Sequence, residues 1–340
     1  MSELVLPQPY LLFLGDVSIT PYAKTAFGLR DWAAERCVGE YALPASTVTT
    51  GLPRLTPAQA RARGARSMVI GVAAPGGEIP GVWIKALIEA LDAGLDVISG
   101  MHTRLESMPE LAAAAARLGR RLIDIRRPPE QVHVGSGRKR TGRRLLTVGT
   151  DCALGKKYTA LTLTREFKQR GVAADFRATG QTGILIAGAG IPMDSVVSDF
   201  LSGAAEALSP DAAPNHWDVI EGQGSIFHPS YACVSLGLLH GSQPDVIVMC
   251  HQVGRDQMVG TEGYPTPGIP EAIELTLTLA RRTNPAVRCA GVSLNTSQLG
   301  EPQARAALAE QSKALGMPVA DPLRPGAELD RLVEACLRAP

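Results

Sequence analysis

The sequence predicts an α/β protein in which parallel strands alternate with helices in two successive domains. Short apolar runs that end in Gly or a polar residue alternate with stretches of helical periodicity, which is the pattern of βαβ units. A chain of 340 residues is long enough for about two domains. Residues 127–143 hold Pro-Pro, several Gly and a cluster of Arg and Lys, with almost nothing apolar, so we expect the domain link there.

The N-terminal half contains the first set of alternating elements. Its helices are supported by the apolar spacing of residues 82–91 and by the Ala-rich segment that follows Pro109. No strand is followed by a complete G-x-G-x-x-G, since 15–20 has a single Gly and 71–80 does not match, so we do not expect NAD. The expected strands are 11–15, 67–73, 96–100 and 121–126, and the expected helices are 82–94 and 109–119.

The C-terminal half repeats the alternation with longer apolar runs, which are typical of strands buried on both faces of a sheet. Ligands bind such sheets beyond the carboxyl ends of the strands. The expected strands are 145–149, 175–180, 217–222, 245–251, 288–295 and 318–322. The expected helices are 156–170, 193–208, 229–240, 269–283, 302–315 and 326–338.

The most informative segment is residues 145–159, LLTVGTDCALGKKYT. An apolar run ends in Gly149, a turn follows, and Gly155 and Lys156 precede a segment that can begin a helix. This is the layout of a phosphate-binding loop, in which backbone N–H groups and a lysine hold a polyphosphate at a helix N-terminus. Five residues separate the two glycines, one more than usual, and Lys157 stands where Ser or Thr normally binds Mg²⁺. The loop predicts a phosphate-rich ligand more strongly than metal-assisted cleavage of ATP; an ordinary Gly-rich turn is the alternative.

Several segments together resemble one protein family. They are VGTDCALGKK, FRATGQTGILIAGAGIPMDSVVSDFLSGAAEAL, DVIEGQGSIFHPSYACVSLGLLHGSQPDVIVMCH, GVSLNTS and PVADPLRPGA. The chain is similar over nearly its whole length to a bacterial and archaeal family long known only as a conserved domain of unknown function. That family has an N-terminal Rossmann-like domain and a C-terminal P-loop domain, and one type of member (DgcN) is a D-glutamate N-acetyltransferase that uses acetyl-CoA. The loop also resembles G-T-D-x-x-x-G-K-T of dethiobiotin synthetase, which carries the same extra residue.

The resemblance implies a Rossmann-like domain at 1–135 and a P-loop NTPase-like, doubly wound parallel sheet at 143–340. It implies an N-acetyltransferase that moves an acetyl group from acetyl-CoA to the amine of an acidic amino acid, and D-glutamate is the amino acid that we expect. Lys156, Lys157 and the N–H groups of 153–157 suit the phosphates of coenzyme A without a metal ion. The resulting coenzyme-binding candidates are Gly149, Thr150, Asp151, Cys152, Ala153, Gly155, Lys156, Lys157, Tyr158 and, for adenine, Asn295.

Two other functions stay open at this point. The first is an ATP- and Mg²⁺-dependent ligase or kinase of the dethiobiotin synthetase type, with Asp151 and Glu221 helping to hold the metal. Because Lys157 departs from the Thr of that enzyme, phosphoryl transfer is not carried over from it. The second is a nucleotide-binding regulator without catalysis. We expect no resident metal under the main hypothesis.

Candidate catalytic and substrate-binding residues follow the expected strands. An amine must be neutral when it attacks a thioester, so a carboxylate or imidazole close to it can serve as general base. Glu221, His228 and His251 are the candidates, while a helix-capping Glu and a core His are the structural alternatives. Arg255 suits a substrate carboxylate. The complete set of substrate-binding candidates is Gln181, Thr182, Gln223, Ser225 and Arg255, with Gly-rich turns and a solvated Arg as alternatives.

Composition limits the partners. A net charge of +1 and 4% aromatic residues argue against a nucleic-acid surface. The basic cluster in 127–143 favours a solvated connector over an RNA site. Six separated cysteines indicate reduced thiols, and no apolar run reaches about 18 residues. We therefore expect a cytoplasmic enzyme with a small-molecule substrate, no membrane partner, and self-association into a homo-oligomer.

Overall fold

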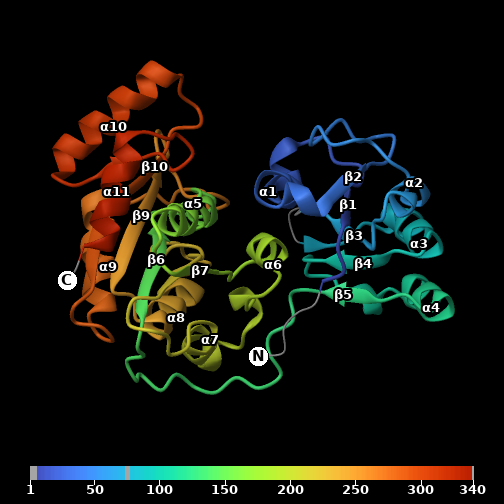
Figure 1. Ribbon diagram of the computed structural model, residues 1–340, viewed down its shortest axis with the longest axis horizontal. Helices are drawn as coiled ribbons and strands as arrows, with labels where there is room; N and C mark the ends of the chain where they lie inside the picture. The colour runs from blue at the N-terminus through green and yellow to red at the C-terminus, as the bar shows by residue number, and fades with distance from the viewer. Residues whose placement is uncertain (1–5, 73–76, 339–340) are drawn as a thin grey trace. The chain divides into compact units, whose positions relative to one another are not determined.

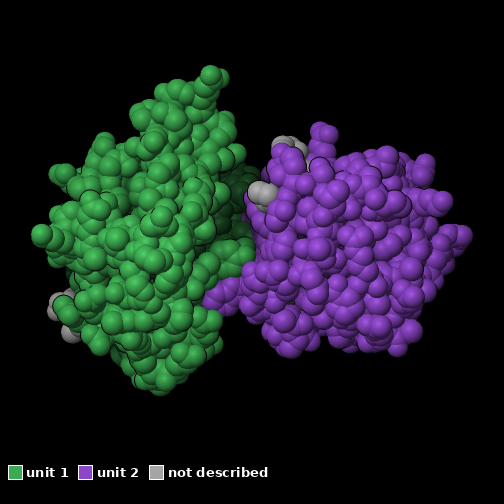
Figure 2. Space-filling model, turned by 90° about the horizontal axis from the view of Figure 1, so that it is seen from above, with its two compact units in different colours: residues 1, 128–180, 193–340 green, residues 2–127, 181–192 purple. Residues whose placement is uncertain are grey.

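The computed structural model describes residues 6–72 and 77–338, which divide into two compact units. Unit 2 contains the chain up to residue 127 together with 181–192, and unit 1 contains 128–180 together with the chain from 193 onward (Figure 2). The chain therefore passes between the units three times. Residues 181–192, which lie within the limits expected for the second domain, pack in unit 2 with the N-terminal part of the chain.

Unit 2 is built on a parallel sheet. Within its described residues, five strands lie in the order β2-β1-β3-β4-β5 (Figure 1). The first strand is paired on both edges and all four of its residues are buried, as expected for a strand in the middle of a sheet. The strands are β1 (Tyr10–Phe13), β2 (Cys37–Tyr41), β3 (Ser67–Ile70), β4 (Asp96–Ser99) and β5 (Leu122–Asp124).

Helices of unit 2 bury apolar stripes against this sheet. One of them, α3, repeats Ala and Leu at helical spacing, so that residues 86, 87, 90 and 91 are buried. Trp83, just before α3, packs edge-on against Phe13 with ring centroids 5.4 Å apart. The helices are α1 (Lys24–Trp32), α2 (Pro57–Ala62), α3 (Ile84–Asp92), α4 (Pro109–Leu118) and, from the later part of the chain, α6 (Gln181–Ala187).

Helix α6 is anchored in unit 2 by buried polar contacts. Thr182 Oγ1 lies 3.0 Å from Thr25 Oγ1 on α1, and the Arg36 guanidinium donates to the carbonyl of Ile186. The side chains of Ile184 and Leu185 are fully buried. Seven residues are too few for a stable isolated helix, so these contacts stabilise α6.

Unit 1 is built on a second parallel sheet. Within its described residues, six strands lie in the order β11-β10-β9-β6-β8-β7. From β6 the chain fills one side with β7 and β8 and then the other side with β9, β10 and β11, so the sheet is doubly wound. The strands are β6 (Arg143–Gly149), β7 (Ala174–Arg177), β8 (Trp217–Ile220), β9 (Val246–Gln252), β10 (Arg288–Asn295) and β11 (Val319–Ala320).

Helices cover both faces of this sheet (Figure 1). Val248 packs with Phe167 of α5 and Leu332 of α11, whereas the next residue of β9, Met249, packs with Ile273 of α9. This alternation follows from the period of two along a strand. The helices are α5 (Lys156–Gln169), α7 (Leu201–Leu208), α8 (Ala232–Ser242), α9 (Ile269–Ala280), α10 (Glu301–Leu315) and α11 (Ala327–Leu337).

Several expectations differ from the structure. The helix expected at 193–208 begins only at Leu201; short 3₁₀ turns precede it, and Val197 is extended with φ −60° and ψ 137°. The strand expected at 67–73 ends at Ile70, and residue 73 lies outside the described residues. The sequence analysis missed β2, α1, α2 and α6. Among the described residues, none of the helices combines the length and the apolar character that crossing a membrane requires.

Candidate active site

Candidate residues gather at the carboxyl edge of the unit 1 sheet. Strand β6 leads into the loop 150–155, β8 into Glu221, and β9 and β10 end in His251–Gln252 and Asn295. Because all these strands are parallel and adjacent, their carboxyl ends meet at one edge. The motifs that lie up to 146 residues apart in sequence, between 149 and 295, are therefore brought together by the sheet order.

The loop between β6 and α5 has the backbone of an anion-binding turn. Ala153 and Gly155 adopt left-handed conformations, with φ of 53° and 107°, and α5 begins immediately afterwards at Lys156. The side chain of Lys156 is buried, and its Nζ donates to the carbonyl of Asp151 at 2.7 Å. A Cβ at Gly149 would lie 3.2 Å from that Nζ. The Lys156 side chain thus lies across the loop, and the absence of a side chain at Gly149 leaves space for its ammonium group.

The ammonium group of Lys156 is held in a desolvated position. Burial lowers its pKa, and electrostatic interactions with Cys250, Cys152, Asp151 and Glu221 oppose this shift. An incoming anion offers it a stronger partner than a backbone carbonyl, because charge-assisted hydrogen bonds are about twice as strong as neutral ones.

Residues Thr150 and Asp151 tie the loop to the segment after β9. Thr150 Oγ1 lies 2.8 Å from His251 Nδ1, and its backbone N–H donates to the carbonyl of Cys250. Asp151 Oδ2 accepts hydrogen bonds from Arg255 Nη1 at 3.0 Å and from the backbone N–H of Val259 at 2.9 Å. Arg255, which was expected to bind a substrate carboxylate, has Asp151 as its partner in this structure.

Glu221 is a buried carboxylate with fixed orientation. Its Oε2 accepts from the backbone N–H groups of Thr179 at 2.9 Å and Gly180 at 3.1 Å. Burial raises its pKa; the charge of Lys157 lowers it, followed by the two N–H groups and Lys156. Thr179 was not predicted from the sequence; the available signal was its polarity two residues after the end of β7. Gln223, a substrate-binding candidate, donates from Nε2 to Thr179 Oγ1 at 2.8 Å.

The two candidate histidines differ in how their ring nitrogens are hydrogen-bonded. His228 Nε2 lies 3.1 Å from the carbonyl of Val259, and its Nδ1 accepts from the N–H of Ser230 at 3.1 Å. A carbonyl can only accept and an N–H can only donate, so His228 is the neutral Nε2–H tautomer with both nitrogens engaged. His251 has its Nδ1 2.8 Å from Thr150 Oγ1, and the hydrogen bonds among the described residues do not use its Nε2.

The pKa of His251 also suits a base. Burial lowers it, Arg255 lowers it further, and Asp256 partly opposes them. The imidazole is therefore neutral at pH 7. We therefore prefer His251 among the three candidate bases, because its ring is neutral and its Nε2 is not used in a hydrogen bond among the described residues.

The remaining candidates in unit 1 contact either the loop or nearby residues. Asn295 Oδ1 accepts from the N–H of Ser297 at 2.9 Å, which is a turn-forming contact, and its Nδ2 donates to the carbonyl of Leu154 in the loop at 3.4 Å. Ser225 is buried and its Oγ accepts from the N–H of Phe227. The Tyr158 ring lies under Lys157, with 4.7 Å between Nζ and the ring centroid.

Cys152 stands in a group with Asp151 and His228 whose potential ligand atoms all lie within 4.8 Å of one another. Among the described residues, Asp151 Oδ1 is buried without a hydrogen-bond partner. Both nitrogens of His228 are engaged, and Lys156 and Arg255 place positive charge around Asp151. This balance disfavours a divalent cation here.

Gln181 and Thr182 belong to unit 2, where they begin α6. Thr182 bonds Thr25, and a Cβ at Gly100 would lie 2.2 Å from Gln181 Oε1. The structure therefore places Gln181 beside Gly100, just after β4, and Thr182 against α1, both in a different unit from the phosphate loop. Their predicted role stays a prediction.

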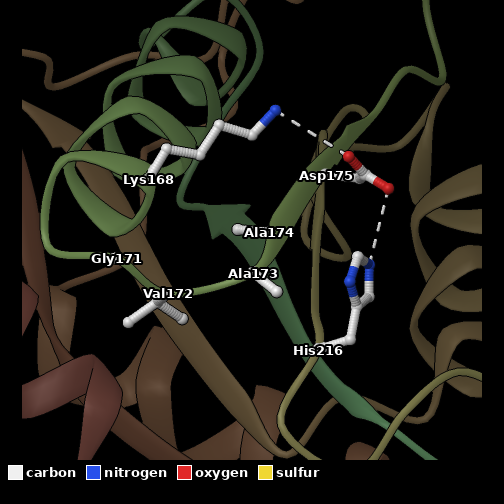
Figure 3. Close-up of a pocket in the computed structure, with 7 residues that line it drawn as sticks. All are labelled: Lys168, Gly171, Val172, Ala173, Ala174, Asp175 and His216. Carbon is white, nitrogen blue, oxygen red and sulfur yellow. Dashed lines mark ion pairs between the residues drawn. The ribbon is translucent and has the colours of Figure 1, made fainter.

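A cavity of about 430 Å³ lies at the opposite edge of the unit 1 sheet (Figure 3). It is close to Ala174, where β7 begins, and therefore at the amino ends of the strands. Asp175 lies 3.8 Å from Lys168 and 3.5 Å from His216 across it. It contains none of the candidate residues, and parallel sheets bind ligands at the other edge, so we do not assign the site to it.

Comparisons with known proteins support the resemblance inferred from the sequence. Residues 132–333 match the family model described as a domain of unknown function, DUF1611, P-loop domain, and residues 35–128 match the DUF1611 N-terminal Rossmann-like domain. A D-glutamate N-acetyltransferase from Tritonibacter scottomollicae is 47% identical over 97% of this chain and 99% of its own. Another D-glutamate N-acetyltransferase, from Pseudoalteromonas sp., is 46% identical over 94% of this chain and 96% of its own.

A solved structure has the same fold. The crystal structure of a DUF1611 family protein from Anabaena variabilis aligns with a TM-score of 0.88 at 32% identity, covering 97% of this chain and 99% of that one. The predicted fold class, a Rossmann-like domain followed by a P-loop domain with parallel sheets, is confirmed, and so is the predicted family resemblance.

Proposed function

This chain belongs to the DUF1611 family, and from that premise we propose that it is an N-acetyltransferase that moves an acetyl group from acetyl-CoA to the amine of D-glutamate. The observation that carries the proposal is the near full-length similarity, at 46–47% identity, to two proteins named D-glutamate N-acetyltransferase. An acyl donor and a small-molecule substrate follow from that activity.

Acetyl-CoA fits the phosphate loop as the acyl donor. Coenzyme A is an ADP derivative, and the loop presents Lys156, Lys157 and a row of backbone N–H groups at the N-terminus of α5, a helix of 14 residues. Near the loop, the cations Lys156, Lys157 and Arg255 lie with the buried carboxylates of Asp151 and Glu221. An anionic ligand is supported by the two lysines at the start of α5.

His251 is the general base of this proposal. The amine of D-glutamate is an ammonium ion in water and must lose a proton before it attacks the thioester carbonyl. His251 Nε2 takes that proton, while Thr150 Oγ1 on Nδ1 fixes the ring. The C–N bond forms and the C–S bond breaks. Of the two protons that the ammonium nitrogen loses in becoming an amide, one protonates the departing thiolate of coenzyme A and the other is released to solvent.

This assignment requires the pantetheine arm to fold back toward the loop. An extended arm is roughly four residue lengths, or about 14 Å. His251 contacts Thr150 in the loop itself. A base at this position therefore acts only on a thioester that is brought close to the phosphate end of the coenzyme.

The direct test is thiol release without ATP. Purified protein is mixed with acetyl-CoA and D-glutamate, and free thiol is followed while N-acetylglutamate is identified by mass spectrometry. We expect thiol release with D-glutamate, much less with L-glutamate, and none without an amino acid. Thiol release that requires ATP and Mg²⁺, or its absence with every amino acid, contradicts the proposal.

Self-association and a cytoplasmic location are also part of the proposal. They rest on the expectations drawn from the sequence. Light scattering coupled to size exclusion measures the first directly, and a mass equal to that of one chain contradicts it.

A further inference from the structure

The residues at the metal-binding positions of this phosphate loop do not fit a magnesium ion. Magnesium-dependent P-loops hold the ion with a Ser or Thr that follows the loop lysine and with an acid at the end of a neighbouring strand. Here these positions are Lys157, the second residue of α5, and Glu221, which directly follows β8. Strand β8 is paired with β6, which leads into the loop. An ammonium group has thus replaced a hydroxyl ligand opposite the acid.

We propose that Lys157 and Glu221 form an internal substitute for magnesium, in which the carboxylate positions the ammonium group and the ammonium group neutralises phosphate oxygens of the ligand. The ligand class is a phosphate anhydride carried by an adenosine, either coenzyme A or an adenine nucleotide. The choice of coenzyme A within that class rests on the proposed function. Glu221 is then a positioning residue and not the general base.

The contacts around Glu221 support a positioning role. Its side chain is 5% exposed, and Oε2 is fixed by two backbone N–H groups from the segment after β7. A carboxylate held in this way cannot swing toward a substrate amine without leaving two backbone N–H groups unpaired, which is unfavourable. The fixed negative charge instead favours a cation beside the loop.

The start of α5 packs against the segment after β8 through Lys156. A Cβ at Gly222 would lie 3.0 Å from Lys156 Cδ and 1.7 Å from the carbonyl of Thr147, so glycine is required for this close packing. Lys157 is the charged group that most opposes the rise in the pKa of Glu221 caused by burial. The Tyr158 ring, 4.7 Å from Lys157 Nζ, adds a cation–π contact. The ammonium group therefore lies over an aromatic ring at the start of α5, where its positive charge acts on Glu221.

The decisive experiment restores the hydroxyl ligand. Binding of ADP and of coenzyme A is measured by calorimetry, in EDTA and in Mg²⁺, for the wild-type protein and for Lys157→Thr. We expect wild-type affinity to be the same in both buffers. We expect the variant to bind at least about tenfold more weakly in EDTA, the loss for one charged hydrogen bond, and to regain affinity in Mg²⁺. Equal affinity of variant and wild type in EDTA, or wild-type binding only with Mg²⁺, overturns the proposal.

Matched variants protect the test against a simple folding defect. Lys168→Thr makes the same change on the same helix, beside Asp175 at the far end, and should bind like wild type. Lys157→Arg keeps the positive charge and should bind in EDTA. If Lys157→Thr does not fold, loss of EDTA binding by Lys157→Arg overturns the proposal, and retained binding supports it.

Glu221→Gln separates positioning from catalysis. A positioning role predicts a raised KM for acetyl-CoA with kcat little changed, whereas a general base predicts a loss in kcat. The calorimetry needs neither the acetyl group nor the amino acid. Metal-free binding without acetyl transfer would therefore contradict the proposed function alone, and acetyl transfer by an enzyme that requires Mg²⁺ for binding would contradict this inference alone.

Discussion

Lys156 is the residue whose removal should affect the acyl donor most directly. Its Nζ is buried in the loop and donates to the carbonyl of Asp151. Lys156→Ala removes a charge-assisted phosphate contact worth about 1.5–3 kcal/mol, which corresponds to a rise in the KM for acetyl-CoA of roughly ten- to a hundredfold. Steady-state kinetics measure this, with Lys168→Ala on the same helix as control. An unchanged KM would remove the loop from the coenzyme site.

His251 should determine the acid limb of the pH profile. Its pKa is lowered from the ordinary 6.5 by burial and by Arg255. As a base it acts when neutral, so kcat/KM should be constant above its pKa and fall as the pH drops below that pKa, which lies under the ordinary 6.5. Between pH 6.5 and the lower pKa of the folded protein, this histidine is protonated more in the unfolded chain than in the folded one. Its contribution therefore lowers the stability of the fold as the pH falls through that range.

His251→Asn should abolish that acid limb and lower kcat by roughly 10²–10⁴-fold. His240→Asn on α8, where the ring bonds the carbonyl of Leu279, is the control and should keep the wild-type profile. Retention of the acid limb by His251→Asn would place the base elsewhere.

For His228 we expect the opposite result, a loss of stability without a change in the pH profile. Both of its nitrogens hold backbone groups, of Val259 and Ser230, so its role in the structure is to fix two loops. His228→Asn should lower stability by about 1–3 kcal/mol through unpaired backbone groups, without shifting the pH limb. Urea unfolding and the pH profile together distinguish this from a catalytic role.

Glycines decide how closely two helices of unit 1 approach. On α8, a Cβ at Gly237 would lie 2.6 Å from Leu201 Cβ, and one at Gly241 would lie 2.2 Å from the carbonyl of Ser202 on α7. Gly241→Ala should therefore cost about 1–3 kcal/mol by overpacking, measured by urea unfolding. Gly268→Ala, where the added atom meets only Pro270 at 3.9 Å, is the control and should cost less than about 1 kcal/mol. Equal costs would contradict the packing argument.

The docking of α6 depends on a glycine at the end of β4. A Cβ at Gly100 would lie 2.2 Å from Gln181 Oε1 and 2.8 Å from its Cβ. Gly100→Val should release α6 from its contacts in unit 2 and raise hydrogen exchange in residues 181–187 above that of α3. Wild-type exchange in α6 would show that the helix is held without this contact.

Among the helices and strands, those with long periodic segments could be predicted from the sequence. The expected strand 288–295 coincides with β10, and the expected helix 156–170 with α5. The helix expected at 193–208 was wrong over its first half, because extended Val197 interrupts it. Short α6 reads as a Gly-rich turn in sequence, and its helical state depends on partners in unit 2, such as Thr25 and Arg36.

The whole molecule does not divide at a single point in the chain. Residues 181–192 pack in unit 2, and Ile184, Leu185 and Ile186 are buried there. A fragment that begins at residue 128 would expose these side chains, whose burial is worth about 1.5–3 kcal/mol each. We expect that fragment to aggregate and a fragment ending at residue 127 to be destabilised, as measured by sedimentation and thermal unfolding. Two separately stable fragments would contradict this.

The sequence by itself determined the alternation of strands and helices, the phosphate loop and the family, because periodicity and motif spacing are local properties. The tertiary structure alone decided which polar groups are partners. Asp151 and Arg255 are 104 residues apart, and Thr179 and Glu221 are 42 apart. These pairs form because the strand order β9-β6-β8-β7 brings the carboxyl ends together, and that order is a property of long-range pairing that no short segment encodes.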